Sequence, residues 1–121
     1  MKKPSLPYVK RAFLYVYVID STQIFMKQPQ DCQNMQEIRT EIDAIDQEVI
    51  HLLGKRFGYV KAASRFKTSE DAVKAPDRFR ALLLQRREWA IAAGLHPDAI
   101  EKMYFDLVTH FIEEEMKLWK K

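Results

Sequence analysis

The sequence contains little cysteine, little glycine and no residue set typical of metal or nucleophilic catalysis. Cys32 is the single cysteine, which excludes an internal disulfide and fits a reducing compartment such as the cytoplasm. Three glycines are too few for the many tight turns of an all-β fold. His51, His96 and His110 are not spaced as metal ligands, and no serine has a histidine placed as its base. We therefore expect neither a metal nor a cofactor.

Long apolar runs and a strong excess of one charge are also missing. No run approaches the ~20 apolar residues of a membrane helix. The run 12–19 follows basic residues as a secretory signal would, but it contains two tyrosines and no Ala-x-Ala cleavage pattern follows it. The 20 Lys and Arg residues exceed the 17 Asp and Glu residues by only three, and acidic residues are interleaved among them. This balance favours neither a membrane nor a nucleic acid as partner.

A helical repeat begins near Asn34 and continues to about Arg65. No proline interrupts it, and Asn34 followed by Glu37 has the spacing of a capping box. The positions of one face are spaced four and three residues apart, as on a helix. They read Ile38, Ile42, Ile45, Val49, Leu52, Arg56, Tyr59 and Ala63. We predict one helix of about 30 residues, roughly 45 Å long.

Two shorter helices are expected after a loop at 67–74. Pro76 suits the first turn of one helix, Gly94 suits its end, and Pro97 begins another that continues to the C-terminus. Residues 1–30 have no helical period and are read as an extension, so the all-α domain spans 31–121. A single copy would leave the ends of the long helix uncovered, so we expect a dimer or a higher assembly.

Charged residues interrupt two of the apolar faces, Arg56 on the long helix and Glu115 on the last one. A guanidinium in such a place needs an anion near it. Together with Lys67 and Arg78, Arg56 would suit a small polyanion, because a guanidinium grips a carboxylate through two parallel hydrogen bonds. Taken singly, the residues have plainer interpretations. Arg56 extends its charge to solvent or pairs with Glu115, and Lys67 is a loop lysine.

Three motifs resemble one protein family. They read DCQNMQEIRTEIDAIDQEVIHLLGKRFGYVKAASRFK, SEDAVKAPDRFRALL and WAIAAGL. Residues 26 to 119 resemble the all-helical AroQ class of chorismate mutases, and within it most closely the isochorismate pyruvate lyases that make salicylate for siderophores. The resemblance implies three-helix chains that intertwine as a homodimer, with each of two sites built from both chains.

The resemblance also implies a set of site residues. Matched position by position, the set comprises Arg39 of a partner chain, with Arg56, Val60, Lys67, Arg78, Leu82, Ile112 and Glu115 of the first chain. Arg39 and Arg56 are 17 residues apart in the sequence, about 25 Å along a helix, which is too far to hold one small metabolite within a single chain. An antiparallel partner helix would bring them together.

The implied reaction is pericyclic and needs no covalent intermediate. Arg39 and Arg56 would hold the two carboxylates of the substrate, and Lys67 would face the ether oxygen, where negative charge grows as the C–O bond breaks. The lyases have glutamine where this chain has Glu115. A carboxylate only accepts hydrogen bonds, so Glu115 must be protonated to donate one. We therefore expect activity to rise as the pH falls.

Three functions stay open on the sequence. The first is an isochorismate pyruvate lyase, which gives salicylate and pyruvate, with side activity as a chorismate mutase, which gives prephenate. The second is a dedicated chorismate mutase of aromatic amino-acid synthesis. The third is a helical interaction or regulatory module that has the fold without catalysis.

Overall fold

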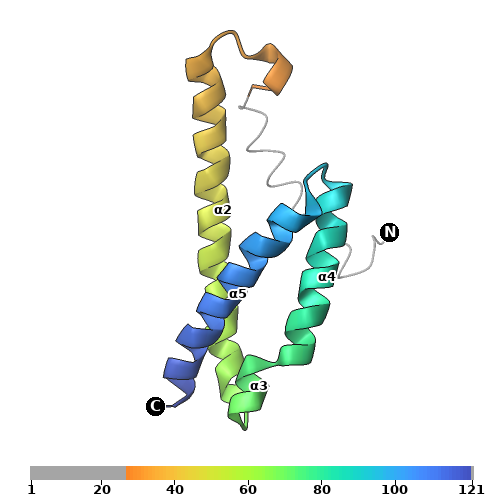
Figure 1. The fold of residues 1–121 in the computed structure, drawn as a ribbon. Coiled ribbons are helices and arrows are strands. Elements are labelled where there is room, and N and C mark those ends of the chain that lie inside the picture. The colour runs from red at the N-terminus through yellow and green to blue at the C-terminus, as the bar shows by residue number, and fades with distance from the viewer. Residues whose placement is uncertain (1–26, 121) are drawn as a thin grey trace, which may run out of the picture. The chain divides into compact units, whose positions relative to one another are not determined.

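The computed structural model describes residues 27–120, and three long helices account for most of them (Figure 1). They are α2 (Met35–Ala63), α4 (Pro76–Ala92) and α5 (Pro97–Trp119). A short helix, α3 (Glu70–Lys74), and two 3-10 turns, η1 (Pro29–Asp31) and η2 (Ser64–Phe66), complete the order. Since the described residues contain no strand, the all-α class with one long and two shorter helices is confirmed.

The predicted division into an extension, 1–30, and a domain, 31–121, stays a prediction, because residues 1–26 and 121 lie outside the described part of the chain. Within 27–120, none of the helices is both long enough and apolar enough to cross a membrane. The contacts of the chain define two compact units, one ending at His51 and the other beginning at Leu52.

In the first unit, side chains cap the start of α2. The Asn34 Oδ1 atom accepts a hydrogen bond from the Glu37 N–H at 2.9 Å, so the predicted N-cap is confirmed. In a standard capping box, the Glu37 carboxylate would accept a hydrogen bond from the N–H of Asn34 itself. Here it accepts from the N–H of Gln33, one residue earlier, at 2.8 Å. That bond, together with the ion pair to Lys27 at 2.9 Å, lowers the pKa of Glu37.

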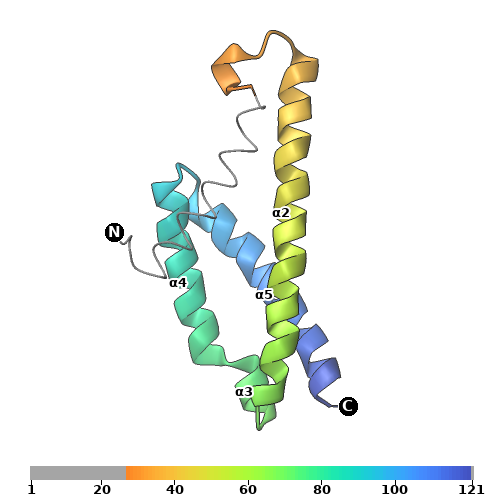
Figure 2. The same cartoon turned by 180° about the vertical axis from the view of Figure 1, so that it is seen from behind.

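In the second unit, α5 packs against α4, α3 and η2 (Figures 1 and 2). The best-buried apolar side chains come from three of these elements and are Val73, Leu82, Ala90 and Val108. The turn between α4 and α5 is a Schellman motif, in which the Leu95 N–H donates to the Ala90 carbonyl at 2.8 Å. Gly94 adopts φ +78°, so its predicted role as the stop of α4 is confirmed.

The expected loop at 67–74 is wrong in part, because residues 70–74 form α3. The Ser69 Oγ atom caps this helix by accepting from the Ala72 N–H at 3.0 Å, and acidic residues occupy its first turn. Val73 anchors it with only 1% of its surface exposed. One apolar residue in a five-residue helix cannot display a helical period, so the sequence pattern did not reveal it.

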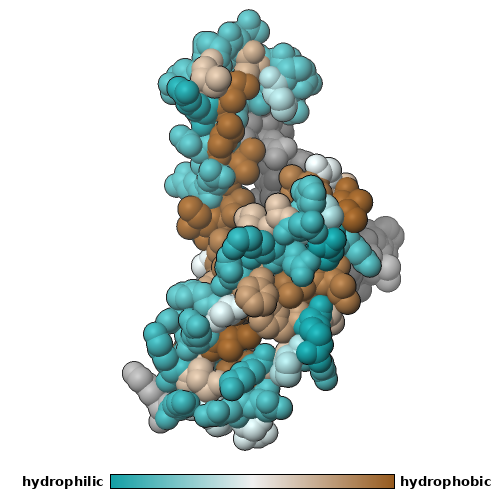
Figure 3. Space-filling model, in the orientation of Figure 1, coloured by the Kyte–Doolittle hydropathy of each residue, from teal (hydrophilic) through white to brown (hydrophobic). Residues whose placement is uncertain are grey.

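The apolar face of α2 is left largely exposed by the described residues. No residue of this helix is buried, and Ile42, Ile45 and Val49 are 49%, 50% and 47% exposed. Figure 3 shows apolar surface along this part of α2. Removing such side chains from water is worth ~25 cal/mol per Å² of apolar surface, so this face is available for a partner.

Candidate functional site

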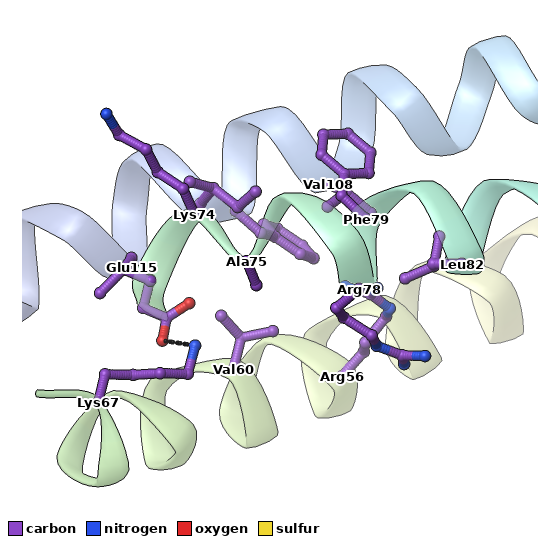
Figure 4. Close-up of a pocket in the computed structure, with 13 residues that line it drawn as sticks. Arg56, Val60, Lys67, Lys74, Ala75, Arg78, Phe79, Leu82, Val108 and Glu115 are labelled. Carbon is purple, nitrogen blue, oxygen red and sulfur yellow. Dashed lines mark hydrogen bonds and ion pairs between the residues drawn. The ribbon is translucent and has the colours of Figure 1, made fainter. Parts of the chain in front are cut away.

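A pocket lies within the second unit, between the C-terminal half of α2, the segment 67–82 and α5 (Figure 4). Four cationic side chains line it, together with one carboxylate and a wall of apolar residues. Seven of the lining residues were predicted from the sequence: Arg56, Val60, Lys67, Arg78, Leu82, Ile112 and Glu115. The remaining predicted residue, Arg39, is exposed on α2 in the first unit and does not line the pocket.

An ion pair between Lys67 and Glu115 closes one end of the pocket. The Lys67 Nζ atom donates to Glu115 Oε2 at 2.9 Å, and Figure 4 shows the two side chains pointing toward each other. The Glu115 side chain is only 5% exposed and that of Lys67 is 23% exposed. A buried carboxylate needs such a partner, because its desolvation otherwise costs several kcal/mol. The plainer interpretation that Glu115 pairs with Arg56 is therefore wrong.

The guanidinium groups of the pocket are free to bind an anion. Among residues 27–120, none of the ion pairs involves Arg56 or Arg78. The Arg56 guanidinium lies 5.5 Å from the centre of the Phe111 ring, which holds it by a cation–π contact without neutralising it. Both residues are among those that line the pocket.

The pKa of Arg86, one helical turn beyond Leu82 on α4, lies below its ordinary value. Burial lowers this pKa, and Tyr104 opposes the change. The charges of Arg78 and Arg56 lower it further. Clustered cations without acidic partners repel one another, so a bound dianion would stabilise this part of the protein.

Apolar residues from α4 and α5 form the opposite wall. Leu82 and Val108 are 3% and 8% exposed. The ring of Phe111, which also lines the pocket, stacks on the ring of Phe57 with 5.0 Å between the ring centres. Ala75 adopts φ +43°, the left-handed conformation, where the chain turns from α3 into α4. This costs a non-glycine residue ~1 kcal/mol, but it turns the chain so that the first turn of α4 brings Arg78 to the pocket.

Sequence reasoning missed six residues of the lining: Val73, Lys74, Ala75, Phe79, Val108 and Phe111. Three of them, Phe79, Val108 and Phe111, lie on apolar helix faces whose periodicity was visible in the sequence. Val73 and Lys74 lie in the segment 67–74 that was read as a loop, and Ala75 directly follows it. Within 27–120, no three His, Cys, Asp or Glu side chains gather as a metal-binding group.

Comparison with known proteins identifies the family. Residues 38–116 match the profile of the family chorismate mutase type II. The chain belongs to this family. It is 43% identical over 95 residues to the isochorismate pyruvate lyase of Pseudomonas aeruginosa, which covers 78% of this chain and 94% of that protein. It is also 35% identical over 81 residues to the T-protein of Haemophilus influenzae, which covers 66% of this chain but 20% of that protein.

The type II chorismate mutase match spans every residue that lines the pocket. Arg39 also falls inside the matched range, although it lies away from the pocket of its own chain. The pocket therefore combines an apolar wall, two arginines that have no carboxylate partner among residues 27–120, and one lysine that is already paired. Such an arrangement suits a small apolar ring that carries carboxylates.

The ion pair generates a stability prediction. Lys67→Met should lower the free energy of unfolding by about 2 kcal/mol, because it leaves the Glu115 carboxylate buried without a partner. Adding Glu115→Gln should restore most of the loss, which urea unfolding at one protein concentration measures. Lys74→Met, which removes an exposed lysine from the same pocket, should change stability by less than ~0.5 kcal/mol. Equal effects of the two lysine substitutions would refute the role of the pair.

Proposed function

We propose that the protein is an isochorismate pyruvate lyase, which converts isochorismate to salicylate and pyruvate and rearranges chorismate to prephenate as a side activity. The observation that carries the proposal is the 43% identity to such a lyase across 94% of its length. The pocket agrees with it, because two arginines without an ion-pair partner among the described residues lie beside an apolar wall. Salicylate for siderophores and a cytoplasmic location are predictions that follow from the resemblance.

In the proposed complex, the arginines hold the substrate and Lys67 acts on the breaking bond. Arg56 and Arg78 bind carboxylate oxygens, which restricts the enolpyruvyl group to a reactive conformer above the ring. Lys67 donates to the ether oxygen as negative charge develops there. Because Lys67 Nζ is bound to Glu115, the substrate must share this ammonium group with Glu115 or draw it away.

The proposed site is completed by a second copy of the chain. The pocket of one chain encloses about 110 Å³, which is small beside the roughly 300–1,000 Å³ of most small-molecule sites. The half-exposed apolar face of α2 supports a homodimer in which this face is covered. Arg39 then enters the pocket of the partner chain and supplies the second carboxylate contact.

The proposed activity is tested with the purified protein and two substrates. We expect salicylate fluorescence to appear with isochorismate, and slower loss of absorbance with chorismate. Faster turnover of chorismate than of isochorismate would favour the dedicated chorismate mutase, which the family match also supports. No turnover of either substrate would favour the non-catalytic helical module.

The shared site predicts complementation between two inactive variants. Arg39→Ala and Arg56→Ala each damage both sites of a homodimer, so each alone should lose at least ~100-fold in kcat/KM. After joint unfolding and refolding, half of the dimers are mixed and each mixed dimer has one intact site. The mixture should recover about a quarter of the wild-type activity.

A matched control uses two residues that the proposal places on the same chain of each site. Arg56→Ala mixed with Lys67→Ala should recover nothing, because every mixed dimer still has one defect in each site. Recovery in this control, or none in the first mixture, would contradict the shared site.

The role of Glu115 predicts a pH dependence. If Glu115 must carry a proton to donate to the substrate, kcat rises as the pH is lowered from alkaline to mildly acidic values, whereas Glu115→Gln donates at every pH. The variant should therefore flatten the profile, and its rate should exceed that of the wild type at alkaline pH. A wild-type kcat that is level across this range would show that Glu115 acts only as the partner of Lys67.

A further inference from the structure

The last turn of α5 holds Lys67 at two points. Besides the ion pair at its side chain, the main-chain carbonyl of Lys67 accepts a hydrogen bond from the indole Nε1–H of Trp119 at 3.0 Å. Glu115 and Trp119 are four residues apart on α5, so both side chains extend from the same face one turn apart. Figures 1 and 2 both show this end of α5 beside the segment that joins α2 to α3.

The segment around Lys67 has few other constraints. Lys67 follows the 3-10 turn η2 in an extended conformation, and its own N–H makes a long bond of 3.3 Å to Ser64. Phe66 is 74% exposed, so it does not anchor the segment within the chain. Lys120 and Glu70 also connect α5 to this region, but their 3.6 Å ion pair is exposed and contributes little.

We propose that Trp119 is a positioning residue that fixes the main chain of Lys67 while the ammonium group changes partners. The inference rests on the proposed function, in which Lys67 Nζ must act on the substrate as well as on Glu115. If the ion pair alone held the segment, releasing Nζ from Glu115 would release the segment as well. The indole N–H is a donor only, and it contacts the backbone, so its bond survives that exchange.

We expect the hydrogen bond from Trp119 to affect the catalytic step and not the binding of substrate. Arg56 and Arg78 lie on α2 and α4, and among the described residues no hydrogen bond or cation–π contact joins either of them to Trp119. We therefore expect the binding of carboxylates not to depend on Trp119. A lysine whose main chain moves by even 1 Å acts poorly on a developing charge, because such stabilisation depends on preorganised geometry. Trp119 should thus affect kcat and leave KM almost unchanged.

The test replaces Trp119 by phenylalanine, which keeps an aromatic ring but removes the N–H donor. We expect kcat with isochorismate to fall about tenfold and KM to stay within about twofold. Hydrogen–deuterium exchange of the segment 64–69, measured without ligand, should become faster. Trp89→Phe makes the same change at an exposed tryptophan of α4, and Lys120→Met removes the neighbouring ion pair. Both should leave kcat and the exchange rate unchanged.

A double-mutant cycle separates positioning from general loss of packing. In a Lys67→Ala background, Trp119→Phe should cost no further activity, because the side chain that Trp119 positions is already gone. A further tenfold loss in that background would overturn the proposal. So would an unchanged exchange rate at 64–69 in the single variant. If the wild-type protein turns over neither substrate, the proposed function fails, while the exchange measurement still decides whether Trp119 holds the segment.

Discussion

The buried carboxylate of Glu115 is the constraint on which the second unit of the structure depends. A nearly buried charge is stable only with a partner, and Lys67, 48 residues earlier in the chain, provides it. The pair draws the segment after α2 onto α5 and closes one end of the pocket. α3 and α4 continue from this segment, so the same contact helps to place Arg78 and Leu82 along the remaining sides.

The pocket and the apolar face of α2 share one property, which is that the described residues supply a binding partner for neither. Arg56 and Arg78 have no carboxylate partners among the described residues, and Ile42, Ile45 and Val49 are about half exposed. The proposed anionic ligand would neutralise these arginines, and the proposed second copy of the chain would cover the apolar face. A protein that left both unsatisfied would carry clustered positive charge and exposed apolar surface without a function for either.

Much of the fold was predictable because its signals are local. Asn34 caps α2 through a residue three positions later, Gly94 ends α4 within one turn, and Pro76 and Pro97 begin their helices. The charges of the site on α2, α4 and α5 were visible as interruptions or neighbours of apolar helix faces. Its apolar residues, Val60, Leu82 and Ile112, were predictable as site residues only through the family resemblance, since periodicity marks a helix face but not what the face surrounds. α3 escaped prediction because five residues with one buried valine carry no period, and its cap at Ser69 resembles an ordinary polar loop.

By itself the sequence determined the three long helices, the positions at which charge interrupts their apolar faces, and the membership of the chorismate mutase type II family. These depend on neighbours within a few residues or on matching patterns, so no coordinates are needed for them. Only the tertiary structure decided that Glu115 pairs with Lys67 and not with Arg56, and that the indole of Trp119 bonds to the Lys67 carbonyl. Those contacts join residues about fifty positions apart, and only the packing of α5 against the segment after α2 brings them within hydrogen-bond distance.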